Sequence, residues 1–282
     1  MKISLVLEGG GMRGAYTAGV LTYLLDKNVS FDYGVGISAG AMNLASFWMK
    51  RADYLKEVAV HYMSDSANVG IKPLLREGTY VGYDHMFDDL LAKVVKYDLS
   101  LLNNTESNFE VGVFNMQKGD DEWLTKNQLT LTNLKAACTL PIAGKPVTID
   151  GFDYMDGGIV TMVPIGRSIQ QGNDKHFVII TKDSEYVRHP EPAIEVNACK
   201  LLYRKTPAIV ERLKVRDKVY YQEMDLVEKM VNEGSAYLMR PTSKIPVSRF
   251  KGDPQALQAC FDLGIRDAKS QWDAISKFLE KS

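Results

Sequence analysis

Apolar and polar positions follow two alternating patterns along the first fifty residues. Residues 3–7 form a continuous apolar run, as expected for a strand that is buried on both faces of a parallel sheet. Residues 14–26 place apolar side chains three and four positions apart, which is helical spacing. Residues 33–37 predict a second strand and residues 39–50 a second helix. This β-α-β-α order predicts an α/β fold, with a parallel sheet between two layers of helices.

The middle of the chain carries shorter patterns. They predict helices over residues 84–96 and 133–139, and strands over residues 109–116, near Trp123 and over residues 177–181. The last of these runs is uninterrupted and apolar, which is typical of a central parallel strand. Asp150-Gly151 stands between two apolar runs and indicates a tight hairpin.

The last third of the chain changes to a helical pattern. Pro190 and Pro192 mark the junction. Residues 207–234 then keep apolar positions mostly three or four apart and end on a glycine, as expected for one long amphipathic helix with its stop. Residues 254–280 indicate a further helix.

These patterns divide the chain near residue 185. We expect an α/β domain over residues 1–185, and a mainly helical extension over residues 186–282 packed on it. The first segment carries 17 basic and 22 acidic residues, and the second carries 17 and 13. The mild positive excess of the extension favours a solvated appendage, and a docking surface for anionic lipid head groups is the alternative.

Composition excludes several classes of protein. Among 282 residues, 34 are basic and 35 acidic, whereas proteins that bind nucleic-acid phosphates are normally far more basic. The three cysteines are widely spaced, which excludes a disulfide framework and a cysteine-based zinc site. No apolar run reaches the roughly 20 residues of a membrane-spanning helix, and the apolar start is too short for a signal peptide. We expect a cytoplasmic protein without a nucleic-acid partner.

A glycine-rich segment follows the first predicted strand directly. Gly9, Gly10, Gly11 and Gly14 let the chain turn sharply and leave amides uncovered beside a helix N-terminus, which makes an anion site. Such a site suits the pyrophosphate of a dinucleotide or the oxyanion of an acyl-transfer reaction. A dinucleotide fold also needs an acidic residue at the end of the second strand. That position holds Ser38 instead.

The segment around Ser38 has the form of a nucleophile elbow. Gly36, Ser38 and Gly40 fit the pattern GxSxG at a predicted strand-to-helix junction, where a strained turn lifts the hydroxyl out of the sheet. The amide of Ala39 can then join the glycine-rich loop in binding an oxyanion. The alternative is that these small residues only allow close contact between helix and sheet.

A serine nucleophile needs a base. None of the four histidines stands in a recognisable catalytic context, and His176 opens a predicted strand. The better candidate is Asp156, at the end of the strand that returns from the predicted hairpin. Gly157 and Gly158 follow it and let another backbone segment pass close to the carboxylate. An ordinary Asp-Gly turn is the alternative.

These motifs as a set resemble the patatin-like phospholipases. The resemblance rests on residues 9–14, 36–40, 137–141 and 156–158. It covers roughly residues 1–185 and is weaker over the extension. It implies a three-layer α/β/α fold with a mostly parallel sheet, Ser38 as nucleophile, Asp156 as general base, and an oxyanion hole at Gly9–Gly11 with Arg13 behind it.

Two positions depart from the pattern of that family. Thr161-Met162 stand where the family often has paired asparagines, and Cys138-Thr139 stand where it often has serine. The first departure concerns packing beneath the site rather than the dyad. We interpret Cys138 as a buried filler, because no histidine is placed to activate it.

The resemblance implies a lipid acyl hydrolase that cleaves carboxylic esters through an acyl-enzyme, without metal or cofactor. The alternatives are a catalytically silent relative that binds lipid or a partner protein, and a dinucleotide-binding oxidoreductase. The implied partner is a lipid or acyl ester, and peripheral contact with a membrane stays open. Residues 61–97 and Trp48-Met49 carry apolar side chains that suit either an acyl pocket or the core.

Overall fold

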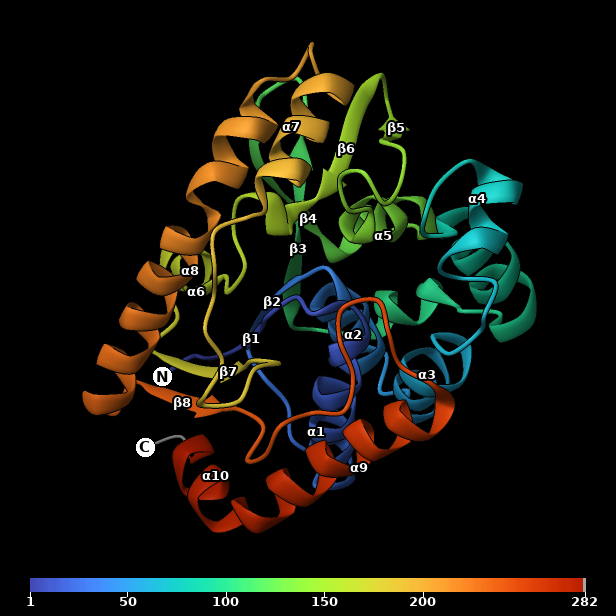
Figure 1. Cartoon of the computed structure of the whole chain (residues 1–282). Helices are drawn as coiled ribbons and strands as arrows, with labels where there is room; N and C mark the ends of the chain where they lie inside the picture. The colour runs from blue at the N-terminus through green and yellow to red at the C-terminus, as the bar shows by residue number, and fades with distance from the viewer. Residues whose placement is uncertain (281–282) are drawn as a thin grey trace.

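The computed structural model describes residues 1–280 and places an eight-stranded sheet between two layers of helices (Figure 1). The strands are β1 (Ile3–Leu7), β2 (Tyr33–Ile37), β3 (Asn108–Asn115), β4 (Asp120–Thr125), β5 (Val147–Ile149), β6 (Phe152–Asp156), β7 (Lys175–Ile179) and β8 (Ala236–Met239). Residues 281 and 282, the end of the expected extension, lie outside the described residues.

The strand order is β5-β6-β3-β2-β1-β7-β8, and β4 pairs with residues 110–115 along the other edge of β3. The five strands from β3 to β8 in this order run parallel, whereas β4 and β6 pair with β3 in antiparallel fashion. Leu7 stands opposite both Gly36 and Ile179, so β1, β2 and β7 end at one edge of the sheet. The loops that follow parallel strands at such an edge commonly form ligand sites.

Helices cover both faces of the sheet. They are α1 (Gly14–Asp26), α2 (Ala39–Trp48), α3 (Ala52–Lys56), α4 (Ile71–Glu77), α5 (Leu131–Cys138), α6 (Ile165–Gln170), α7 (Ala193–Leu202), α8 (Ala208–Asn232), α9 (Pro254–Ser270) and α10 (Trp272–Leu279). One core lies under α1, α2 and α9, and a second lies under α6 and α8. The expected three-layer α/β/α fold, with a mostly parallel sheet and C-terminal helices, is confirmed.

Helix α9 crosses α1 with the two backbones in contact. A Cβ added at Gly19 would lie 2.0 Å from the carbonyl oxygen of Phe261, and one added at Gly264 would lie 2.2 Å from that of Tyr16. Only glycine fits at both positions, because any side chain would force the helices apart. The C-terminal part of the chain therefore packs tightly on the N-terminal part.

Several elements differ from the sequence-based expectations. The expected helix over residues 254–280 is broken at Gln271, because the chain turns there and Trp272 packs on Tyr23 with ring centroids 5.7 Å apart. Residues 85–95, expected as an α-helix, form a wider π-helix. Strand β8, which extends the sheet beyond β7, was not predicted.

Candidate active site

Ser38 occupies the turn between β2 and α2, in a strained conformation. Its φ of 56° and ψ of −125° lie outside the regions that residues with a side chain normally occupy. The turn is this tight because Gly36 and Gly40 bring backbones together: a Cβ on Gly36 would lie 2.7 Å from the Gly40 carbonyl oxygen, and one on Gly40 would lie 2.8 Å from that of Glu8. This is the geometry of a nucleophile elbow.

Asp156 ends strand β6 and is completely buried. One carboxyl oxygen, Oδ1, accepts a hydrogen bond of 2.7 Å from the Gly158 amide. The other, Oδ2, has no partner that meets hydrogen-bond geometry among residues 1–280, yet the Ser38 hydroxyl is near enough to affect its protonation. Burial raises the pKa of Asp156, and the Ser38 hydroxyl, the Gly158 amide and two arginines oppose that shift.

Ser38 and Asp156, 118 positions apart in sequence, line the same small cavity. It lies at the carboxyl edge of the sheet, where β2 ends beside β3 and β3 pairs with β6. Close packing fixes this juxtaposition, because a Cβ on Gly157 would lie 2.5 Å from the carbonyl oxygen of Gly112 in β3. The structure thus brings the two expected groups together at one site.

The glycine-rich loop forms another wall of this cavity. Its Gly10 and Gly11 amides, and the Ala39 amide across from them, make no hydrogen bond to the described part of the chain. The Gly9 amide, by contrast, donates to the Met162 carbonyl at 3.4 Å. Three of the expected oxyanion donors therefore have no acceptor among residues 1–280.

Arg13 and Gly14 lie behind the loop and fix its shape. The Arg13 Nε donates to the Gly10 carbonyl at 3.3 Å. A Cβ on Gly14 would lie 2.8 Å from the Cβ of Ala39, so the starts of α1 and α2 touch here. Burial lowers the pKa of Arg13.

A buried ion pair between Glu8 and Lys182 contacts the glycine-rich loop, and the sequence analysis did not predict it. Glu8 is fully buried, pairs with Lys182 and accepts hydrogen bonds from the amide and hydroxyl of Thr181. Lys182 also donates to the Gly9 carbonyl at 3.3 Å, and burial lowers the pKa of Lys182 to about 7. The available signal was a charged residue directly after the apolar run 177–181.

His176 lies near the amino-terminal ends of the parallel strands, away from the carboxyl ends where Ser38 lies. It is the second residue of β7, where it stands opposite Ser4 of β1, and its Nδ1 contacts the hydroxyls of Ser4 and Ser168 at 3.0 and 2.8 Å. Burial lowers the pKa of His176 to about 4. This position suits its expected role at the start of a strand and takes it away from Ser38.

An apolar cavity of about 90 Å³ opens from Ser38 on the side of α2. Met63, Tyr83, Met86 and Phe87, from the stretch expected to wall a pocket or the core, line it together with Cys138. Leu74 and Leu75 do not, since both are exposed on α4. Trp48 belongs to the core, with its ring 5.3 Å from that of Phe109. Burial raises the pKa of Cys138 well above its usual value, which keeps it a thiol.

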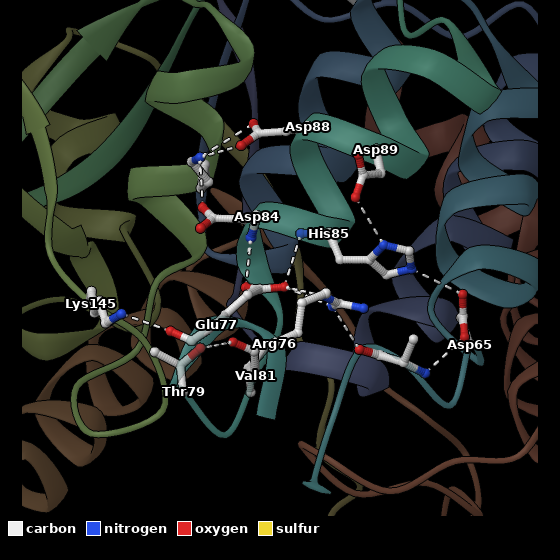
Figure 2. A network of polar contacts seen from close by, with 12 residues as sticks. Asp65, Arg76, Glu77, Thr79, Val81, Asp84, His85, Asp88, Asp89 and Lys145 are labelled. Atoms are coloured by element: carbon white, nitrogen blue, oxygen red, sulfur yellow. Dashed lines mark hydrogen bonds and ion pairs between the residues drawn. The ribbon is translucent and has the colours of Figure 1, made fainter. Parts of the chain in front are cut away.

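A polar network holds the outer wall of this apolar cavity in place (Figure 2). The Glu77 carboxylate, at the end of α4, accepts hydrogen bonds from the amides of Asp84 and His85 at 3.1 and 3.2 Å. The His85 ring lies between the carboxylates of Asp65 and Asp89, 3.2 Å from each. These contacts join α4, the preceding loop and the π-helix that carries Met86 and Phe87.

The described chain has neither a metal-binding cluster nor a membrane-spanning helix. Among residues 1–280, no group of three His, Cys, Asp or Glu side chains is arranged to hold a metal ion. No helix in the same range combines the length and apolar character needed to cross a membrane.

The fold and the site define an α/β protein with a serine at a strained elbow and a buried carboxyl in the same cavity. The chain belongs to the patatin-like phospholipase family, whose model matches residues 5–168, so the resemblance seen in the sequence is confirmed. A second model, a domain of unknown function called DUF6363, matches residues 206–280.

Two curated proteins are similar to this chain. The uncharacterized protein YjjU of Escherichia coli is 27% identical over 195 residues, 67% of this chain and 55% of its own length. The probable lipid hydrolase 463L of Invertebrate iridescent virus 6 is 24% identical over 189 residues, 61% of this chain and 65% of its own length. The chain thus spans less than two thirds of either relative. Among solved structures, VipD from Legionella pneumophila aligns with 97% of this chain and 67% of its own, at a TM-score of 0.48 and 14% identity.

Proposed function

We propose that the protein is a lipid acyl hydrolase, with Ser38 as nucleophile and Asp156 as general base. The observation that carries this proposal is the pairing of a strained serine with a buried carboxyl whose Oδ2 has no hydrogen-bond partner in the described chain. Membership of the patatin-like phospholipase family and the similarity to a probable lipid hydrolase support the substrate class.

The reaction follows from the positions of these groups. Ser38 Oγ attacks the carbonyl carbon of a carboxylic ester while its proton passes to Asp156 Oδ2. The carbonyl oxygen becomes an oxyanion held by the amides of Gly10, Gly11 and Ala39. When the alcohol leaves it takes the proton from Asp156, and an acyl-enzyme remains. Water then attacks the acyl-enzyme and gives one proton to Asp156. As the bond to the serine breaks, Ser38 Oγ takes this proton back from Asp156, and the fatty acid is released.

The raised pKa of Asp156 suits this role. A carboxylate with an ordinary pKa is a weak base toward an alcohol, and burial makes it a stronger one. The apolar cavity that begins at Ser38 offers a place for the acyl chain. Methionine, valine and aromatic side chains form most of its wall, and Asn43 and Arg249 also border it.

The direct test combines covalent labelling with hydrolysis of p-nitrophenyl acyl esters. A fluorophosphonate probe should label the protein at Ser38, and Ser38→Ala should abolish both labelling and turnover. Asp156→Asn should lower turnover by about 10²–10⁴-fold. Ser276→Ala on α10 and Asp153→Asn on β6 are the matched controls, because they make the same changes outside the cavity.

Three outcomes would decide against this proposal. If Ser38→Ala kept the turnover of the wild type, Ser38 would be excluded as the nucleophile. Absence of both labelling and hydrolysis, with retained binding of lipid, would instead identify a silent binding protein. Binding of NAD(P) without labelling would revive the oxidoreductase alternative.

A further inference from the structure

The cavity that contains Ser38 and Asp156 is strongly cationic. Five basic side chains line it, namely Arg13, Lys182, Arg188, Arg216 and Arg249. Asp156 is the one carboxyl among the described residues that line it. Binding of a neutral ester does not require positive charge, so the excess of basic over acidic side chains in this cavity suggests a further role.

The arginines of this cavity have fewer acceptors within the described protein than donors. Arg188 and Arg216 share a single carboxylate oxygen of Glu191. The side chain of Arg188 is only 6% exposed, and its Nε has no hydrogen-bond partner within residues 1–280. A buried guanidinium donor without an acceptor is costly.

Arg249 reaches the cavity from the loop between β8 and α9, which runs past α2 in Figure 1. The Arg249 backbone is anchored, because its carbonyl accepts a hydrogen bond of 3.2 Å from the Met12 amide. Its guanidinium forms no ion pair with a carboxylate in the described chain. The loop thus holds, at the glycine-rich segment, a cation that has no carboxylate partner among residues 1–280 and lies 5.9 Å from the centre of the Phe250 ring.

The three arginines are close enough to repel one another. Burial and the charges of Arg249 and Arg188 together lower the pKa of Arg216 to about 10, against the opposing effect of nearby carboxylates. Arg216 is nevertheless held in place, since its Nε donates to the carbonyl of Gly158, beside Asp156. An oxyanion between these groups would satisfy the free donors and cancel the repulsion.

The cationic cavity and the apolar cavity adjoin each other at Ser38. Ser38, Gly11, Leu140 and Arg249 border both spaces. An ester bound with its acyl chain in the apolar cavity therefore has its alcohol portion among the arginines. The cationic cavity itself measures about 30 Å³, room for about two water molecules.

A wider groove continues from the cationic cavity. It measures about 230 Å³, shares Arg216, Arg249 and Leu140 with that cavity, and carries Glu191 and Glu195 along its wall. It supplies the room that the small cavity lacks for the rest of an alcohol. The anion would lie where the two spaces meet, at Arg216 and Arg249.

We propose that Arg188, Arg216 and Arg249 form a binding subsite for a phosphate group on the alcohol portion of the ester. All three come from the segment after residue 185, outside the matched patatin-like region. Planar guanidinium groups suit phosphate because each presents two parallel donors to two oxygens. This inference rests on the proposed function, and it assigns a specificity role to the C-terminal segment.

The test compares two esters with the same acyl chain, 1-lauroylglycerol 3-phosphate and the neutral 1-lauroylglycerol. We expect wild-type kcat/KM to favour the phosphate ester, and Arg249→Gln to reduce that preference at least tenfold. Arg249→Lys should restore part of it. Arg212→Gln is the matched control, because Arg212 lies one turn before Arg216 on α8 and pairs with exposed Asp120 instead.

A binding measurement on Ser38→Ala supplies a second readout. Glycerol 3-phosphate should raise its melting temperature, and the added Arg249→Gln change should remove the effect. Inorganic phosphate alone reports whether free phosphate is recognised as well as the esterified group. Without ligand, Arg249→Gln should not lower the melting temperature, because it relieves repulsion; a loss of stability would mark Arg249 as structural and overturn the proposal.

The outcomes separate this inference from the proposed function. Hydrolysis of both esters with an equal loss in Arg249→Gln, and no stabilisation by glycerol 3-phosphate, would overturn the phosphate subsite and leave the hydrolase intact. No hydrolysis of any ester and no fluorophosphonate labelling would overturn the proposed function, and this inference with it.

Discussion

Replacing Ser38 by glycine should stabilise the protein, although it removes the proposed nucleophile. Ser38 has a φ of 56° and a ψ of −125°, and a residue with a Cβ in such a region stores about 1–3 kcal/mol of strain. Glycine adopts such a conformation without this strain.

The expected size follows from two opposing effects. Glycine loses about 0.5–1 kcal/mol relative to alanine, because its unfolded chain is more flexible. Subtracting this from the strain leaves Ser38→Gly more stable than Ser38→Ala by about 1 kcal/mol. That corresponds to a rise of about 2 °C or more in melting temperature for a chain of this size. Urea unfolding of the two purified variants measures the difference in free energy directly.

The variants Ser276→Gly and Ser276→Ala are the control for the difference in stability between glycine and alanine at position 38. Ser276 lies in the last turns of helix α10, where glycine should be less stable than alanine by about 1 kcal/mol. The two sites should therefore respond in opposite directions. If glycine is less stable than alanine at position 38 by the same amount as at position 276, the elbow is not strained, and the argument from backbone geometry to a nucleophile fails.

Two further predictions concern pH and the pocket wall. Because burial raises the pKa of Asp156, kcat/KM for a neutral ester should rise with pH through a midpoint above the ordinary aspartate range; a midpoint within that range would contradict the assignment. Because the pKa of Asp156 is raised in the folded state, protonation of this carboxyl stabilises the folded protein. This contribution to the free energy of unfolding is lost as pH rises through the raised pKa. In Asp156→Asn, the free energy of unfolding should no longer fall over that pH range. Glu77→Gln weakens two amide hydrogen bonds in the wall of the apolar cavity (Figure 2), and should lower kcat/KM a few-fold more for p-nitrophenyl laurate than for the butyrate. Asp89→Asn, at the exposed end of the same network, should not change that ratio.

Local sequence accounts for the strands and turns that frame the site. The pattern around Ser38 predicts the elbow because its geometry depends on a few neighbours: a side chain at Gly36 or Gly40 would meet a carbonyl oxygen at 2.7 or 2.8 Å. The hairpin at Asp150-Gly151 is likewise local, with φ values of 51° and 82° at its two central residues. Such features need no knowledge of the rest of the chain.

The missed features depend on contacts between distant segments. Strand β8 has only four residues, too few for a period, and it forms because β7 offers a free edge. Lys182 follows an apolar strand, and its sequence neighbours do not reveal the buried Glu8 that pairs with it. The break at Gln271 is set by the packing of Trp272 and Phe278 on the N-terminal part.

The segment after residue 185 contributes to the site as well as to the fold. It adds β8 to the edge of the sheet, and α9 contacts the backbone of α1, the helix that begins at the glycine-rich loop. It also places Arg216 on the Gly158 carbonyl and the Arg249 carbonyl on the Met12 amide. These two contacts hold the loops that carry Asp156 and the free amides. A change in the position of α8 or of the loop before α9 would therefore move the proposed base and the proposed oxyanion donors relative to Ser38, which stays fixed by β2 and α2. The C-terminal segment is thus able to set both the alignment of the reacting groups and the charge that an ester meets beside them.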